Sequence, residues 1–325
     1  MREKAYKLPI QEKKADEHPY LNGVWMAPAI FSIYGHERTV FLKSLSVLRN
    51  QVGVLGEDVR LDFTATVKLH AEGMLLFFAE LKRLLFLTQG RVEITCTLPH
   101  NSKVAQVLKK LGVLDLLGVK ADVIPVDHDV VNWRAASGHL VLGAKYEDIL
   151  QDFDGEIAPP LQANLYTGLT EAMTNVLNHA YDLPRNDGLN VTETRKNWWM
   201  FSHERDDILS VVFCDLGAGI PRTLPLKRRS VWNRLWRKGL RSDSEIIKFA
   251  VKDSVSRTRK SHRGKGLRQI VQVINGVVAA EAAVFSNNGS LVMRSGGKTR
   301  VQEYTDSIMG TLIFWRIPLQ VKEDV

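Results

Sequence analysis

Cysteine is scarce in this sequence: the 325 residues contain only two, Cys96 and Cys214. Both lie inside apolar runs, VEITCTL and LSVVFCD, which are typical of buried strands. A cysteine in such a run serves as a small hydrophobic residue, so we expect neither a disulfide nor a metal ligand. The chain also has no separated CxxC pairs and no HExxH, which argues against a protein-bound zinc site.

Long apolar stretches are missing as well. No uninterrupted apolar run approaches the roughly 20 residues that cross a bilayer. The opening residues, MREKAYKLPIQEKKADEHPY, contain no apolar segment of the kind that directs secretion. We therefore expect a cytoplasmic protein with no membrane partner. The sequence also has no internal repeat and no low-complexity tract.

Negative charge is scarce in one part of the chain. Residues 222–268 hold 16 lysines and arginines against only Asp243, Glu245 and Asp253, a net charge of +13. Because the whole chain carries +8, the remainder carries −5. The basic character therefore belongs to a single segment, as expected for a segment that meets phosphate or an acidic partner.

The chain is too long for one ordinary hydrophobic core, so we expect two domains. Residues 1–25 are polar and charged and are expected to form a loosely held tail. Turn-forming residues over 126–160 end in a proline pair and indicate a domain boundary near residue 130. The predicted domains are therefore 26–130 and 131–325, and the predicted fold class is α/β (α+β).

Strands and helices alternate in the first domain. A strand is predicted near 59–64, followed by a helix in EGMLLFFAELKRLLFL, whose apolar residues recur at helical spacing. A second strand is predicted in RVEITCTLP, and a second helix in SKVAQVLKKLGVLDLLG, with Ser102 as its N-cap and Gly118 at its end. Lysine and arginine residues on these helices are interpreted as solvated faces. The result is a small β-α-β-α unit.

The segments VRLDFTATVKLHAEGMLLFFAEL and LKKLGVLDLLGV resemble a STAS domain, the fold of the anti-sigma-factor antagonists. Those antagonists carry an Asp-Ser pair before the glycine that opens the helix, and the serine is phosphorylated. The corresponding residues here are His70, Ala71 and Glu72, before Gly73. Because Ala71 has no hydroxyl, the resemblance favours a scaffold or docking role over a phosphoswitch.

The stretch LTEAMTNVLNHAY in the second domain places Glu171, Asn175 and His179 four residues apart. On a helix from about 160 to 181, these residues lie along one face. The simplest interpretation is the solvated face of an amphipathic helix. Its buried side is predicted to contain Leu169, Ala172, Met173, Val176 and Leu177. Three further motifs favour a functional interpretation instead.

The second motif begins with an aspartate at a strand end. After the apolar strand LSVVFCD comes DLGAGI, with Asp215, Gly217 and Gly219. The two glycines let the backbone approach a planar ligand closely, and the carboxylate accepts hydrogen bonds from an exocyclic amine. Taken alone, a D-x-G-x-G sequence is equally compatible with an ordinary turn.

Two more motifs follow. SHRGKGLRQI places Gly264 and Gly266 at the start of a helix, where free amide groups and the positive end of the helix dipole suit a phosphate. Lys265 and Arg268 add positive charge beside them. The last motif, MGTLIFWRIPL, puts Thr311 at the head of a terminal strand. A further stretch, SGGKTR, lacks the first glycine of a Walker A loop and is interpreted as a hairpin turn.

In this order, the four motifs resemble the ATP-binding boxes of the GHKL ATPases, which include gyrase, the heat-shock chaperones and the histidine kinases. The Glu-Asn-His helix is most similar to that of the anti-sigma-factor serine kinases. The resemblance covers about residues 150–320 and implies a Bergerat α/β sandwich that binds ATP and Mg²⁺. The STAS-like half resembles the usual binding partner of those kinases, which implies regulation in cis or through a homodimer.

The resemblance also implies roles for single residues. Glu171 is the expected general base or orienter for the attacking water or acceptor hydroxyl, and Asn175 is the expected Mg²⁺ ligand. Asp215 and Thr311 are expected to recognise the adenine amine. Gly217 and Gly219 would lie beneath the base, and the phosphate lid would contain Gly264, Lys265, Gly266 and Arg268. His179 is interpreted as structural.

The expected lid insertion, about residues 221–263, is long and basic. It predicts a cationic amphipathic helix over about 229–239, with Trp232 and Trp236, and another helix over about 243–254. Three interpretations remain open: charges that face water and the triphosphate, a nucleic-acid surface, and docking of an acidic protein partner. We favour the first combined with the third.

Two functional hypotheses follow from these patterns. The leading one is an ATP- and Mg²⁺-binding regulatory enzyme that hydrolyses ATP or transfers its γ-phosphate to a protein serine or threonine. The alternative is a non-catalytic module in which ATP only sets the shape of the lid and so gates binding of a protein or nucleic acid. The chain offers no dimerisation helix with a phospho-acceptor histidine before the ATPase part, which disfavours a sensor kinase.

Overall fold

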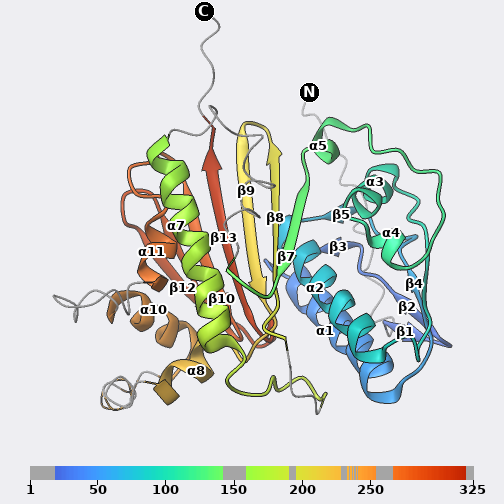
Figure 1. The fold of residues 1–325 in the computed structure, drawn as a ribbon, viewed down its shortest axis with the longest axis horizontal. Coiled ribbons are helices and arrows are strands. Elements are labelled where there is room, and N and C mark those ends of the chain that lie inside the picture. Colours follow the sequence, from blue (N-terminus) through green and yellow to red (C-terminus); the bar gives the residue numbers. More distant parts are fainter. Residues whose placement is uncertain are drawn as a thin grey trace, which may run out of the picture.

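Helices and strands are mixed throughout the chain (Figure 1). The computed structural model describes residues 19–141, 159–189, 195–227, 241–253 and 266–319, together with Asn233, Leu235, Arg237 and Gly239. The α/β (α+β) class predicted from the sequence is confirmed. We call residues 19–131 the N-terminal unit and residues 134–319 the C-terminal unit.

A four-stranded sheet of order β1-β2-β4-β6 forms the centre of the N-terminal unit. Its strands are β1 (Tyr20–Leu21), β2 (Val24–Met26), β4 (Val59–Asp62) and β6 (Ile94–Thr97). A separate parallel pair consists of β3 (Ile30–Phe31) and β5 (Lys68–Leu69). Residues 20–25, which we expected in the polar tail, instead belong to the sheet, because the Trp25 ring is fully buried and stacks on Phe77.

The helical segments of this unit are α1 (Glu37–Arg49), the π-helical turn η1 (Asn50–Leu55), α2 (Ala71–Thr88), α3 (Ser102–Lys110), α4 (Val113–Leu116) and α5 (His128–Val131). The predicted N-cap at Ser102 is wrong by one residue. Asn101 caps α3, because its side-chain oxygen accepts a hydrogen bond from the Val104 amide at 3.1 Å. The predicted helix also ends early, since Gly112 adopts a left-handed conformation (φ +74°) and separates α3 from α4.

The C-terminal unit contains an antiparallel seven-stranded sheet of order β12-β11-β10-β13-β9-β8-β7. The strands are β7 (Arg134–Gly138), β8 (Trp198–Arg205), β9 (Ile208–Asp215), β10 (Glu281–Ser286), β11 (Gly289–Arg294), β12 (Thr299–Glu303) and β13 (Thr311–Pro318). The stretch SGGKTR joins β11 to β12, as the predicted hairpin turn. The helical segments are α7 (Pro159–Asn175), the π-helical turn η3 (Val176–Ala180), α8 (Ile220–Lys227), α10 (Asp243–Asp253) and α11 (Gly266–Gln272).

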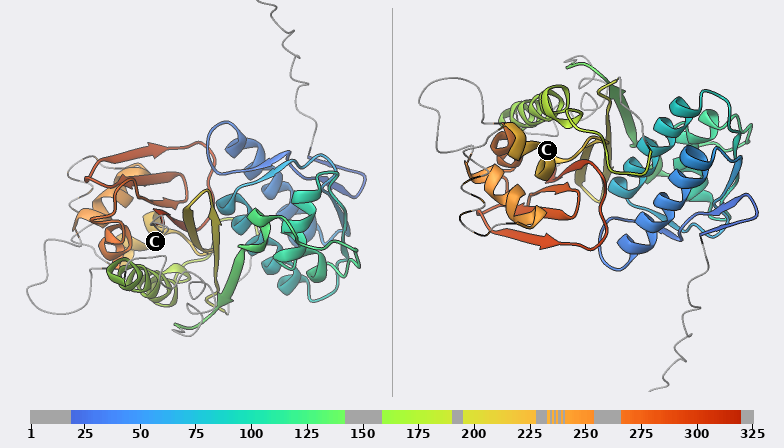
Figure 2. Two further views of the ribbon diagram at one scale, coloured as in Figure 1. Left: turned by 90° about the horizontal axis from the view of Figure 1, so that it is seen from above. Right: turned by 90° about the horizontal axis from the view of Figure 1, so that it is seen from below.

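Both faces of the large sheet are covered (Figure 2). On one face, Met200 and Phe213 pack with Leu165 and Leu169 of α7 in a buried cluster that also includes residues of α10 and α11. On the other face, strand residues share a single buried cluster with α1 and α2 of the N-terminal unit. Because successive strand residues point to opposite faces, the apolar residues 211–214 of β9 serve both clusters. The two units are therefore layers of one packed structure.

A buried ion-pair cluster lies between the two units. Glu80 of α2 accepts hydrogen bonds from Arg49 at 2.8 Å and from Arg185, in the loop after η3, at 3.0 Å. Arg83 donates to Asp187 at 2.7 Å, and both side chains are almost fully buried. The interpretation of Arg83 as part of a solvated helix face is therefore wrong, because the second unit covers this side of α2.

Both cysteines are free. Cys214 is fully buried, and burial raises the pKa of its thiol well above its usual range. Across the described ranges, no helix is both long enough and apolar enough to cross a membrane.

Candidate functional site

Asp215 and Thr311 lie side by side at adjacent strand ends. Asp215 is the last residue of β9, and its register partner on β13 is Thr311, the first residue of that strand. Both residues are buried, with 6% and 8% exposed. Burial raises the pKa of the Asp215 carboxyl to about 6, and hydrogen bonds from Gly217 and Thr311 oppose this rise. The carboxylate is therefore poorly solvated. Among the described residues, no cationic side chain forms an ion pair with it.

The turn after Asp215 packs tightly against the end of the α7–η3 segment. The Gly217 amide donates to the Asp215 carboxylate at 2.9 Å, and the Ala218 amide donates to the Ala180 carbonyl at 2.7 Å. A Cβ atom on Gly217 would lie 2.3 Å from the Ala180 carbonyl oxygen. Gly219 has φ +83°, a conformation that favours glycine. Both glycines predicted from the sequence are thus required by the backbone itself.

Ser286 and Asn287, at the end of β10, support the same turn. The Ser286 hydroxyl accepts from the Ile220 amide at 2.9 Å and lies 3.1 Å from the Thr311 hydroxyl. Asn287 donates to the Ala218 carbonyl at 3.0 Å and accepts from the Gly310 amide at 3.2 Å. Our sequence reasoning missed both residues. The signal was the change from an apolar strand to polar residues in VFSNN.

Helix α7 carries Glu171 and Asn175. Leu169, Ala172, Met173 and Val176 are buried as predicted, whereas Leu177 is only partly buried. Burial raises the pKa of the Glu171 carboxyl. The Asn175 side-chain nitrogen is buried and has no hydrogen-bond partner within the described ranges. Since such an unsatisfied amide costs about 1–3 kcal/mol, packing alone does not account for an asparagine at this position.

The helix changes geometry immediately after Asn175. Residues 176–180 form the π-helical turn η3, and π-helical turns within helices occur frequently at functional sites. His179 lies in this turn and is exposed, and Ala180 at its end contacts the Asp215 turn. Ala180, which contacts the Asp215 turn, therefore lies only five residues after Asn175 in the sequence. Among the described residues, no side-chain hydrogen bond links Glu171 or Asn175 directly to Asp215.

The helix α11 begins at Gly266, as the third motif predicted. It packs against α7 at Gly168, where a Cβ atom would lie 2.6 Å from the Val273 side chain. Arg268 is therefore on a helix that is fixed next to the one carrying Glu171 and Asn175. Gly264 and Lys265 lie outside the described residues.

Only part of the expected lid can be compared with the prediction. The helix expected over 243–254 is present as α10, and its Ile246 packs with Leu235 in a small buried cluster. The helix expected over 229–239, with Trp232 and Trp236, lies largely outside the described residues.

Arg185 connects this site to the N-terminal unit. Its Nε donates to the Met309 carbonyl at 2.5 Å, two residues before Thr311, while its other nitrogens contact Glu80. The guanidinium also lowers the pKa of Asp215 by its charge, although burial has the larger, opposite effect.

The arrangement offers a carboxylate acceptor, a glycine turn packed against Ala180 and Asn287, and an amide and a second carboxylate on the neighbouring helix. Such groups suit an uncharged planar donor at Asp215 and a hard cation at Asn175. No protein-family model matches this chain, and a search of curated proteins also finds no match.

Proposed function

We propose that this protein binds ATP with Mg²⁺ at the Asp215 turn and α7, and that it hydrolyses ATP or transfers the γ-phosphate to a protein serine or threonine. The observation that carries the proposal is the buried Asp215 carboxylate beside Thr311, held by a glycine turn against the end of the Asn175 helix. The order of the four motifs, which resembles that of the GHKL ATPases, supports the same function. Under this proposal the N-terminal unit is STAS-like.

Asp215 would accept a hydrogen bond from the exocyclic amine of adenine, with Thr311 assisting through its hydroxyl. The close contact between Gly217 and Ala180 fixes the turn that holds Asp215, so the carboxylate is kept in one position for the base. The raised pKa of Asp215 is consistent with a carboxylate whose hydrogen-bonding capacity the protein leaves partly unused.

Asn175 would hold Mg²⁺, whose charge offsets that of the triphosphate. The ligand would be the side-chain oxygen. A phosphate oxygen would accept a hydrogen bond from the buried side-chain nitrogen of Asn175, which has no partner among the described residues. Glu171 lies one helical turn before it and would orient or deprotonate the attacking hydroxyl or water. Its raised pKa moves it toward the range in which a carboxylate works as a base near neutral pH. Gly266 and Arg268, with Gly264 and Lys265, would contact the phosphates.

An equilibrium titration with labelled ATP tests the binding step. Asp215→Asn should weaken binding by one charged hydrogen bond, about 1.5–3 kcal/mol or roughly 10- to 150-fold. Asp207→Asn is a matched control, because Asp207 is an exposed residue at the other end of β9. Equal affinity in the wild type and Asp215→Asn would contradict the placement of the adenine.

Phosphate release separates the enzyme from a non-catalytic ATP-gated module. Turnover in the wild type that Glu171→Ala abolishes, with ATP binding retained, is the result expected of the enzyme. Asn175→Ala should reduce the Mg²⁺ dependence of ATP binding as well as turnover. ATP binding without turnover at any protein-partner concentration would support the module instead.

The basic segment is proposed to couple nucleotide state to an acidic protein partner. If ATP orders this segment, protease cleavage within 225–262 should slow when a non-hydrolysable ATP analogue is added. A nucleic-acid partner would instead give an affinity that falls steeply between low and physiological salt, which a gel-shift assay measures.

A further inference from the structure

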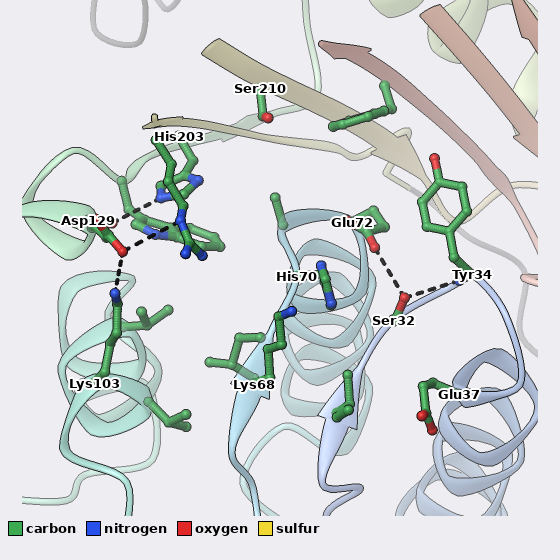
Figure 3. A pocket seen from close by; sticks show the side chains of 18 of the residues that line it. Ser32, Tyr34, Glu37, Lys68, His70, Glu72, Lys103, Asp129, His203 and Ser210 are labelled. Carbon is green, nitrogen blue, oxygen red and sulfur yellow. Dashed lines mark hydrogen bonds and ion pairs between the residues drawn. The ribbon is translucent and has the colours of Figure 1, made fainter. Parts of the chain in front are cut away.

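A cleft of about 900 Å³ lies between the N-terminal unit and the C-terminal sheet (Figure 3). This volume is within the range of small-molecule sites, roughly 300–1,000 Å³. Strands β8, β9, β10 and β13 contribute one wall, which we call the roof. Strands β3 and β5 and the start of α2 contribute the floor, which includes His70 and Glu72.

The roof consists of one row of polar side chains across four strands. The row, in strand order, is Glu281, Arg316, Ser210 and His203. Residues paired in this way point to the same face, with neighbouring Cβ atoms about 5 Å apart. The next row on this face is Ala283, Phe314, Val212 and Phe201, which packs against the N-terminal unit. The face therefore changes from apolar to polar where the two units separate.

Most acidic side chains of the cleft already have basic partners. The ion pairs are Arg294 with Glu281, Lys103 with Asp129, Arg205 with Asp129 and Asp206, and His36 with Glu37. His203 also contacts the Asp129 carbonyl at 2.9 Å and stacks on Trp133. These contacts occupy the carboxylates of Glu37, Asp129, Asp206 and Glu281.

Several hydrogen-bond donors of the cleft have no partner. Within the described part of the chain, no hydrogen bond or ion pair involves the side chains of Lys68, His70, Ser210 or Arg316. The Tyr34 hydroxyl is buried and likewise has no hydrogen-bond partner. An unsatisfied buried hydroxyl such as that of Tyr34 costs free energy unless a ligand or water satisfies it, whereas Lys68 and Arg316 are exposed to solvent in the cleft.

Among the described residues that line the cleft, Glu72 is the one acidic residue without a basic partner in an ion pair. It is 5% exposed and accepts a 3.4 Å hydrogen bond from Ser32. Burial raises the pKa of Glu72 to about 7, despite hydrogen bonds and the charge of Lys68 that act in the other direction. Burial therefore favours the neutral form of this carboxyl, which opposes an anion less than an ionised carboxylate would.

We propose that this cleft is a binding site for a small anionic molecule whose carboxylate or phosphate group contacts Arg316 on the roof and Lys68 on the floor. Ser210 and His70 supply further hydrogen bonds to the same ligand. Arginine binds carboxylate and phosphate through paired N–H groups, whereas lysine acts as a point charge, and the two together suit either anion.

The cleft is distinct from the proposed nucleotide site. Ser210 and Arg316 lie five residues from Asp215 and Thr311 along β9 and β13. At about 3.4 Å per residue, this separates the two places by roughly 17 Å. A small anion and ATP can therefore be bound at the same time, and the anion site does not depend on the proposed function.

Equilibrium dialysis of the full chain with labelled inorganic phosphate and labelled citrate tests the site. A saturating non-hydrolysable ATP analogue is included so that the nucleotide site is occupied. The wild type is expected to bind at least one probe with one-to-one stoichiometry. Arg316→Gln and Lys68→Gln should each weaken binding about tenfold or more, and both are exposed, so the fold is retained. Arg300→Gln, an exposed position on the edge strand β12, is the matched control and should bind as the wild type does.

Three outcomes would overturn the proposal. The first is that neither probe binds at about 1 mM. The second is equal binding by wild type, Arg316→Gln and Lys68→Gln, which would mean that the anion is elsewhere. The third is loss of binding in Glu72→Gln with binding retained in Arg316→Gln, which would indicate a cationic group at Glu72. Unchanged or tighter binding in Glu72→Gln supports the proposal. The preferred probe then identifies phosphate or carboxylate as the recognised group.

Discussion

Replacing Glu80 with glutamine should weaken the contact between the two units and lower the free energy of unfolding. Glu80 is fully buried in α2 and accepts hydrogen bonds from Arg49 at 2.8 Å and from Arg185 at 3.0 Å. Arg185 in turn donates to the Met309 carbonyl beside the candidate site. The substitution keeps the shape of the side chain but removes the charge that pairs with Arg49 and leaves Arg185 with only Asp187 at 3.4 Å.

The size of the effect can be worked out in two ways. Removing one member of a buried ion pair typically costs about 3–5 kcal/mol. The arginines also lower the pKa of Glu80 from 4.5 to about 2, although burial acts in the opposite direction. A shift of this size corresponds to about 3 kcal/mol of unfolding free energy at neutral pH. The two values agree, and we expect a loss of about 3 kcal/mol.

The pH dependence provides a second, independent readout. Because the folded-state pKa of Glu80 is depressed, its contribution is fully present above the unfolded-state pKa of 4.5 and is lost as the pH falls toward 2. The difference in unfolding free energy between wild type and Glu80→Gln should therefore be full at pH 7. At pH 3 it should be less than half as large.

Urea unfolding followed by tryptophan fluorescence measures both quantities. Glu93→Gln is the control, because Glu93 is exposed and its substitution should change the unfolding free energy by less than about 0.5 kcal/mol. If Glu80→Gln costs no more than this control at pH 7, the ion-pair cluster does not hold the units together and the reasoning is refuted.

Two further substitutions test local features of the fold. Gly217→Ala should lower the unfolding free energy by about 1–3 kcal/mol and weaken ATP binding, because the added methyl meets the Ala180 carbonyl. In an ATP titration, Gly118→Ala, at an open position in the N-terminal unit, should leave ATP binding unchanged. Asn101→Ala should cost about 1 kcal/mol in urea unfolding through loss of the α3 cap, whereas Ser102→Ala, at an exposed first helical residue, should cost less than about 0.5 kcal/mol. Equal costs for the latter pair would mean that Asn101 is not the cap.

The spacing of apolar residues was sufficient to predict a helix or strand where the local sequence alone determines it. The helices α2, α7 and α10 and the strand β9 fall close to the residues expected from apolar spacing. Helix ends were less predictable, since Asn101 and Ser102 are both good N-caps and only the backbone conformation selects between them. Gly112 looked like one more helix residue, but its left-handed conformation ends α3.

Contacts between distant segments could not be read from spacing. Glu80 and Arg185 are 105 residues apart, and each by itself looks like a solvated charge. Their burial follows from the packing of α2 on the sheet, which no local pattern specifies. Ser210 and Arg316 could not be paired from the sequence either. They are recognised as neighbours in one polar row only when the strand register is known. In the candidate site, the sequence indicated Asp215 and its glycines, whereas Ser286 and Asn287 became recognisable only through their contacts with the turn.

Replacing the buried carboxyl by an amide should change the unfolding free energy in opposite directions at Glu80 and Asp215. Burial raises the pKa of Asp215 from 3.8 to about 6, so its ionised form disfavours the folded state. For an acid with a raised folded-state pKa, stability is lost as the pH rises from 3.8 to 6, by about 3 kcal/mol in total. Asp215→Asn should therefore raise the unfolding free energy of the ATP-free protein at pH 7 and leave it unchanged near pH 3.

This gain in stability should coincide with weaker ATP binding. A carboxylate that the folded protein stabilises poorly is best explained by a ligand whose hydrogen bonds compensate for its burial. Asparagine can still accept the hydrogen bond from the Gly217 amide, so the turn itself is retained. If Asp215→Asn instead destabilises the protein at pH 7, the charge of Asp215 serves the fold through Gly217 and Thr311, and its assignment to adenine recognition loses its physical basis.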